Sequence, residues 1–198
     1  MTIKKGEDWG HVGPPPADTL VVDDDSGARA AVERARRGGE TIPPLRLRGG
    51  DLARTLGHPA PGSATRHLPV DLGAALLDGR LFWFVSSLVA GSPLGRGRSF
   101  LAMNAAWLGP LNIAPQSHPN DGLLDTVDAT LSLRQARQAR RRARLGDHLP
   151  HPGIRVRRTA AVQVELPRPL AVALDGDVVG HFRRLSVRVE ADALTVIV

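Results

Sequence analysis

The residues best suited to chemistry are acidic and lie in a glycine turn near the middle of the chain. The segment from His118 to Asp125 reads His-Pro-Asn-Asp-Gly-Leu-Leu-Asp and follows an apolar approach at residues 108–115. This order predicts a strand, a tight turn and a second strand, with Gly122 free to take a positive φ. The Asp121 carboxylate and nearby backbone carbonyls are the oxygen donors that Mg²⁺ takes in proteins. The same carboxylate can instead cap the turn by bonding its own backbone.

A glycine-rich turn precedes a short predicted helix in the first third of the chain. Arg48, Gly49, Gly50 and Asp51 follow a predicted strand at residues 45–47 and lead into Leu-Ala-Arg-Thr-Leu-Gly. Arg48 is able to meet a phosphate, because its guanidinium matches phosphate oxygens. The alternative is a structural turn in which Asp51 caps the helix.

A third turn carries two carboxylates near the C-terminal end of the chain. Asp175 and Asp177 flank Gly176 after a predicted strand at residues 170–174. Asp-Gly pairs are also frequent in tight hairpins, so this turn has a purely structural explanation too.

Together these turns resemble the diacylglycerol kinase-like family of lipid kinases, which includes bacterial diacylglycerol kinases and sphingosine kinases. The segment ending at Asp125 matches the family's Asp-Gly-x-Leu-Asp motif, and residues 48–57 match part of its Gly-Thr-Gly-Asn-Asp turn and following helix. The turn at residues 175–177 matches an Asp-Gly-acidic motif. The resemblance extends from about residue 42 to residue 198.

The resemblance implies roles for these residues. It implies a magnesium site made by Asp121 with backbone oxygens of His118 and Leu123. It also implies that Asp177 is the general base that deprotonates a lipid hydroxyl, with Asp175 beside it. The implied ATP contacts are Arg48, Gly49, Gly50 and Asp51. A base near the hydroxyl and a cation near the phosphates are what phosphoryl transfer needs.

The chain also departs from the family pattern. Leu47, Arg48 and Gly50 stand where the family has Gly, Thr and Asn. The family's Gly-Gly-Asp-Gly-Thr loop, whose amides cradle the ATP phosphates, is not found between the predicted helix at residues 28–37 and Arg48.

Three functions therefore stay open. The first is an ATP- and Mg²⁺-dependent kinase that phosphorylates a lipid alcohol. The second is a member without phosphotransfer that acts as a binding or regulatory protein, as a homo-oligomer or paired with another kinase chain. The third is a binder of anionic lipid or nucleic acid through an arginine-rich helix, in which nucleic acid is the weaker alternative because no aromatic residues interleave with the arginines.

Composition limits the remaining possibilities. The 198 residues include no cysteine, which excludes disulfides and thiolate chemistry. The net charge of +6 is almost all arginine, since Lys4 and Lys5 are the only lysines. The sequence has neither a bilayer-spanning apolar run nor a signal peptide, so we expect a cytoplasmic protein with peripheral membrane contact as an option.

The pattern of elements predicts an α+β fold in two parts. Residues 1–62 are expected to form a truncated, NAD-kinase-like α/β segment, because strand and helix alternate there. Residues 63–198 are expected to form an antiparallel β-sandwich, because alternating apolar and polar residues with turn signals recur up to the C-terminus. One helix follows Ser132 and runs to about residue 145. Its arginines are Arg134, Arg137, Arg140, Arg141, Arg142 and Arg144.

Overall fold

The computed structural model describes residues 9–57 and 64–198. Its described part is mostly β, with three helices and one large sheet of eleven strands. This confirms the predicted α+β class. The boundary predicted between residues 62 and 63 lies within residues 58–63, outside the described residues.

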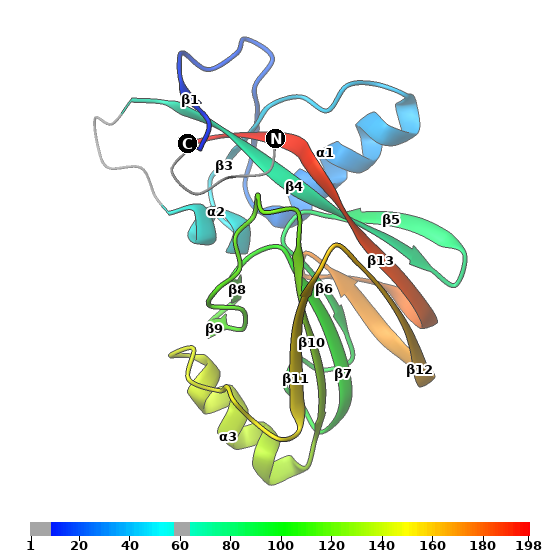
Figure 1. Ribbon diagram of the computed structural model, residues 1–198. Helices are drawn as coiled ribbons and strands as arrows, with labels where there is room; N and C mark the ends of the chain where they lie inside the picture. The colour runs from blue at the N-terminus through cyan, green and yellow to red at the C-terminus, as the bar shows by residue number, and fades with distance from the viewer. Residues whose placement is uncertain (1–8, 58–63) are drawn as a thin grey trace.

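Eight strands form the main path of the sheet, and neighbouring strands along this path are antiparallel (Figure 1). In spatial order they are β1 (His11–Val12), β4 (Arg66–Leu77), β13 (Asp177–Ile197), β12 (Ala161–Leu174), β6 (Ser87–Ala90), β7 (Gly97–Met103), β10 (Leu124–Leu131) and β11 (Ile154–Thr159). The strand β5 (Arg80–Phe84) pairs with β4 through the predicted Asp78-Gly79 hairpin.

The N-terminal segment is a small parallel α/β unit on the same sheet. In chain order it contains β2 (Leu20–Val22), α1 (Asp25–Gly38), β3 (Leu45–Leu47) and α2 (Asp51–Leu56). β2 runs parallel to β3, and β3 pairs in parallel with the end of β13 through Leu45 and Val196. The last strand of the chain therefore joins the two predicted parts into one hydrogen-bonded sheet.

The sandwich core lies between two groups of strands. One group contains β4, β5, β12 and β13, and the other contains β6, β7, β10 and β11, which run side by side at the lower centre of Figure 1. One apolar cluster takes residues from both groups, including Leu77, Phe84, Phe100 and Leu174. Burying large side chains between sheet faces is the main favourable term for such a fold, at roughly 1.5–3 kcal/mol each.

The arginine helix is α3 (Leu133–Ala143), which begins at a capping box formed by Ser132 and Gln135. Its small apolar side chains Ala136, Ala139 and Ala143 are buried against a second core cluster that contains Leu111. Alanine lets the helix lie close to the sheet, so the long arginines are left on the outer faces.

The prediction of a continuous strand at residues 108–115 is wrong. The chain there forms a two-stranded hairpin, β8 (Trp107–Leu108) and β9 (Leu111–Asn112), turning at a left-handed Gly109. An irregular loop then leads to β10. The Gly-Pro pair breaks the strand, because proline lacks the N–H that a ladder needs.

Candidate functional site

The turns that follow the parallel strands β2 and β3 lie side by side. The carboxylate of Asp25 accepts the backbone N–H of Asp51 at 2.7 Å and that of Leu52 at 3.3 Å. Asp25 is 5% exposed, and its burial raises the pKa of this carboxyl to about 6. Because the carboxyl ends of parallel strands meet at one sheet edge, this is where an α/β fold places a ligand.

The chain's own acidic side chains occupy this edge. Asp24 caps α1 by accepting the N–H of Gly27 at 2.9 Å, and exposed Asp23 lies 3.4 Å from Arg48. One N-terminal amide of α1 and two of α2 therefore already donate to Asp24 and Asp25. This arrangement does not fit a cradle for ATP phosphates, which needs free N–H groups and little negative charge.

Among the four predicted ATP contacts, two have clear structural explanations. Gly50 has a φ of 99°, and a Cβ there would lie 2.4 Å from the Asp25 carboxylate oxygen, so only glycine fits. Asp51 points toward the sandwich, where its carboxylate accepts the N–H of Gly109 at 2.9 Å. From the next turn of α2, Arg54 donates to the Gly109 carbonyl and stacks on Trp107, 3.3 Å from the ring centroid. Helix α2 thus holds the β8–β9 hairpin in place through Asp51 and Arg54.

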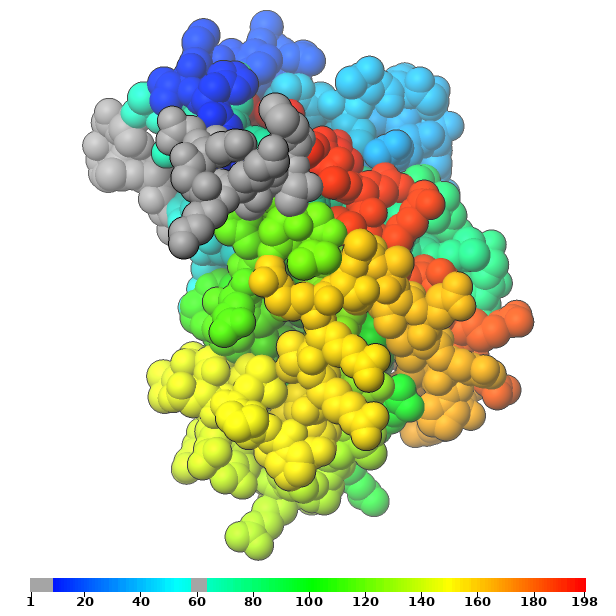
Figure 2. All heavy atoms as spheres, in the orientation of Figure 1, coloured from blue at the N-terminus to red at the C-terminus, as the bar shows by residue number. Residues whose placement is uncertain are grey.

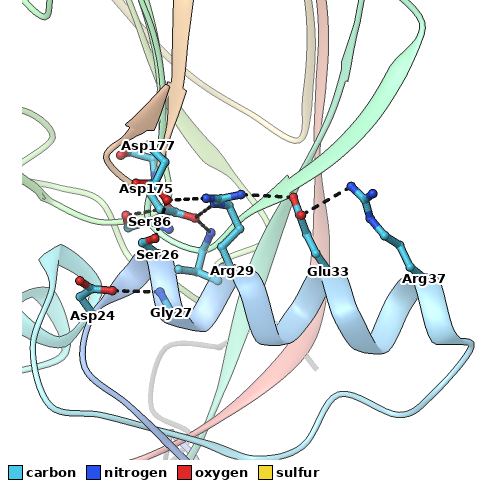
Figure 3. Close-up of polar contacts among 11 residues, drawn as sticks. Asp24, Ser26, Gly27, Arg29, Glu33, Arg37, Ser86, Asp175 and Asp177 are labelled. Carbon is cyan, nitrogen blue, oxygen red and sulfur yellow. Dashed lines mark hydrogen bonds and ion pairs between the residues drawn. The ribbon is translucent and has the colours of Figure 1, made fainter. Parts of the chain in front are cut away.

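The predicted general base reaches the same edge from the sandwich. Asp177 accepts the Ser26 hydroxyl at 2.5 Å and lies 2.6 Å from the Arg29 guanidinium (Figure 3). The hydrogen bond from Ser26, with support from Arg29, lowers the pKa of this carboxyl. Its side chain is 55% exposed.

Asp175 points inward from the same turn. Its carboxylate accepts four hydrogen bonds, from the backbone N–H groups of Val85, Ser86 and Ser87 and from the Ser86 hydroxyl. The side chain has no exposure, and burial raises the pKa of Asp175 to about 7. Asp175 therefore holds the β5–β6 turn and has no access to a substrate.

The carboxylate of Asp121, which was predicted to bind magnesium, is also occupied by contacts within the chain. Asp121 accepts the N–H of Leu123 at 3.0 Å, which is the turn-capping bond, and forms an ion pair with Arg158. Gly122 has the expected positive φ of 71°. The His118 ring packs on Trp9 with centroids 4.7 Å apart. Across residues 9–57 and 64–198 no group of three or more His, Asp or Glu side chains is arranged to hold a metal ion.

One buried carboxylate was missed at the sequence level. Asp71 in β4 is 0% exposed and accepts the N–H groups of Gly122 at 2.7 Å and Asp192 at 3.0 Å. It holds the Asp121 turn against the C-terminal strand, and burial raises its pKa. The available signal was a single aspartate within the apolar run Val-Asp-Leu.

An asparagine connects the two acidic turns of the sandwich. The Asn104 side-chain amide donates to the carbonyls of Asp71 at 2.8 Å and Val85 at 2.9 Å. Asp71 holds the Asp121 turn, and Val85 donates to Asp175. The turns of Asp121 and Asp175 therefore belong to one buried polar network.

Solved structures with this architecture come from Bacillus anthracis str. Sterne. One, described as a candidate diacylglycerol kinase, superposes with a TM-score of 0.64 at 16% identity, covering 90% of this chain and 77% of that one. A second such structure gives a TM-score of 0.66, 16% identity and coverage of 90% and 76%. A third, described as a diacylglycerol kinase, gives 0.61, 17%, 90% and 75%. The fold is therefore that of diacylglycerol kinase-like proteins.

The sequence itself identifies the family. Residues 93–198 match the family model described as the YegS C-terminal NAD kinase beta sandwich-like domain. The chain belongs to this family, which confirms the resemblance noted from the turns. No curated protein matches the chain. No helix in the described part of the chain is long and apolar enough to cross a bilayer.

Proposed function

We propose that this chain is a diacylglycerol kinase-like protein that does not transfer phosphate and acts as a binding or regulatory protein. The observation that carries the proposal is the placement of Asp23 and Asp24 at the nucleotide edge, in the turn between β2 and α1. The Asp24 carboxylate accepts the Gly27 N–H, and the Asp23 carboxylate lies 3.4 Å from Arg48, the predicted phosphate contact.

Energetics support the proposal. A phosphate that enters the turn at residues 23–27 would have to displace the Asp24 carboxylate from the Gly27 N–H, and losing a helix N-cap of this kind costs about 0.5–2 kcal/mol. The charges of Asp23 and Asp24 also repel an anion.

The state of Asp177 supports the same conclusion. A general base toward an alcohol works best when its pKa lies near the working pH. The hydrogen bond from Ser26 and the charge of Arg29 act in the opposite direction and lower the pKa of Asp177. This carboxylate is a weak base.

The alternative is an ATP- and Mg²⁺-dependent lipid kinase. One observation favours it: half-exposed Asp177 lies at the same edge as the turn containing Arg48 and Asp51. In this alternative Asp121 would hold Mg²⁺ together with His118 and Leu123. A partner chain, or a second copy of this one, would supply the phosphate loop.

Calorimetric titration with ATP, with and without Mg²⁺, tests the proposal on the full chain, alongside a radiolabelled phosphotransfer assay on diacylglycerol. We expect neither binding at millimolar ATP nor turnover. Turnover that is lost in Asp177→Asn, but kept in Asp147→Asn as a remote exposed control, would overturn the proposal. Mg²⁺-dependent ATP binding that is lost in Asp121→Ala would do the same.

A further inference from the structure

An arginine-rich surface on α3 lies far from the nucleotide edge (Figure 1). In Figure 2, α3 forms the end of the molecule opposite the blue N-terminal strand. A hollow of about 330 Å³ lies between α3 and the β8–β9 hairpin. It is lined by Pro110, Leu111, Arg137, Arg140, Arg141 and Arg144.

The four arginines converge because of their helical spacing. Positions 137, 140, 141 and 144 are separated by three, one and three residues, which places them on one face of a helix. The helix has no acidic residue. Arg140 donates to the Pro93 carbonyl at 2.9 Å, whereas Arg137, Arg141 and Arg144 have no acidic partner within ion-pair distance among the described residues.

Such an arrangement disfavours the free protein. Like charges three and four residues apart on a helix repel each other. Elsewhere in the described part of the chain, most of the arginines that form ion pairs, such as Arg29 and Arg98, have a carboxylate within 3 Å. An anion in the hollow would relieve the repulsion at α3.

The opposite wall is apolar and fixed. Leu111 is buried and Pro110 lies in the hairpin turn. The backbone of the adjacent Gly109 is hydrogen-bonded to the side chains of Asp51 and Arg54 in α2. A low-dielectric wall beside clustered charge strengthens the local potential, and a wall that does not move lowers the cost of binding.

We propose that this hollow binds a phosphate group. A guanidinium group can donate two parallel hydrogen bonds to phosphate oxygens. The guanidinium groups of Arg137, Arg141 and Arg144 line the hollow, whose volume suits one or two phosphates. The phosphate can come from an anionic lipid headgroup or from a soluble polyphosphate. Leu145, 78% exposed just beyond α3, and Leu133, 50% exposed at its start, favour the lipid source, since both can enter the headgroup region. The proposal is independent of whether the chain transfers phosphate.

Two probes test the site on the full chain. The first is inorganic pyrophosphate, followed by calorimetry. The second is co-sedimentation with phosphatidylcholine vesicles that contain or lack phosphatidylglycerol. The hollow variant carries Arg137→Gln, Arg141→Gln and Arg144→Gln. The control carries Arg155→Gln, Arg157→Gln and Arg168→Gln, which removes the same charge from exposed arginines elsewhere.

We expect at least one probe to bind the wild type and the control, and to bind the hollow variant at least tenfold more weakly. Binding of pyrophosphate alone would assign a soluble phosphate, and binding of anionic vesicles alone would assign a headgroup. An equal loss in both variants would overturn the proposal, because the attraction would then be general charge. Binding of neither probe, or tighter binding of a duplex oligonucleotide than of either, would overturn it as well.

Thermal unfolding checks that each variant is folded. Because removing like charges relieves repulsion, we expect the hollow variant to melt no lower than the wild type. A matched set of Arg→Lys changes at the same three positions keeps the charge but loses the paired hydrogen bonds, and we expect it to weaken binding severalfold.

Discussion

The Asp25 carboxylate accepts the backbone N–H of Asp51 at 2.7 Å and so joins the turns that follow two neighbouring parallel strands. In the chain these residues are separated by a helix and a strand. Their contact fixes the two turns against each other at the sheet edge where an α/β fold places a ligand. The same turn directs the Asp51 side chain to Gly109 of the sandwich.

Replacing this anion should be costly to the fold. We expect Asp25→Ala to lower the free energy of unfolding by about 1–3 kcal/mol, because it leaves the Asp51 and Leu52 amides without an acceptor. Urea denaturation followed by circular dichroism measures the change. Asp23→Ala is the control, since this side chain is 84% exposed and we expect a change within about 0.5 kcal/mol. Equal effects of the two substitutions would contradict this role of Asp25.

Stability should fall as pH rises from about 4 to about 7. Burial raises the pKa of Asp25 to about 6 and of Asp175 to about 7, from 3.8, so the folded state holds more protons than the unfolded state in this window. Their contribution is fully present below the unfolded pKa and is lost above the folded values. For Asp25 this amounts to on the order of 2–3 kcal/mol. His148, whose pKa burial lowers, acts in the opposite sense.

Melting temperatures measured at several pH values isolate the Asp25 part of this effect. We expect Asp25→Asn to fall less steeply than the wild type between pH 5 and pH 7 (about the window set by the raised pKa). Parallel curves for the two proteins would show that Asp25 titrates normally in the fold.

Restoring the family's phosphate loop should create ATP binding. The changes Asp23→Gly, Asp24→Gly, Ser26→Gly and Gly27→Thr turn residues 23–27 into Gly-Gly-Asp-Gly-Thr. The new threonine fits, since a Cβ at position 27 would lie 3.5 Å from the Val22 Cβ, an ordinary contact. We expect Mg²⁺-dependent ATP binding by calorimetry for the restored loop and none for the native chain. Asp23→Asn with Asp24→Asn removes the same charge without glycine and serves as the control. If the restored loop fails to bind ATP, the acidic turn is not what blocks the edge.

Arg158 should matter more than its exposed position suggests. It pairs with Asp121 and lies 3.6 Å from the nearly buried Asp125, whose pKa burial raises and Arg158 lowers. We expect Arg158→Gln to lower the free energy of unfolding at pH 8 by roughly 1–3 kcal/mol and less at pH 5, because an unpaired buried carboxylate is more easily neutralised at lower pH. The neighbouring substitution Arg157→Gln should change stability by less than about 0.5 kcal/mol. Chemical denaturation at the two pH values compares the variants, and a loss that does not depend on pH would count against the pairing.

Much of the fold could be predicted from the sequence because its signals are local. The Asp-Gly hairpin at residues 78–79, the cap at Ser132 and the positive φ of Gly122 each follow from residues within a few positions. Alternation of apolar residues likewise predicted the strands of the sandwich. The lead-in at residues 108–115 failed because Gly109 and Pro110 turn the chain after two residues.

Less of the candidate site could be predicted from the sequence. The motif order predicts a phosphate loop after the first helix, but the strand-to-helix turn that lies beside the Arg48 turn is at residues 23–27, before that helix. Only the parallel pairing of β2 with β3 brings these turns together.

The sequence by itself determined the element types, the turns and the family, since these depend on near neighbours in the chain and on motif order. Tertiary structure alone decided which carboxylates are engaged. Whether Asp25, Asp121 or Asp177 is free to bind a ligand depends on amides and arginines up to 148 residues away, as for Arg29 and Asp177. Burial sets the pKa of such groups, and burial is a property of the packed chain.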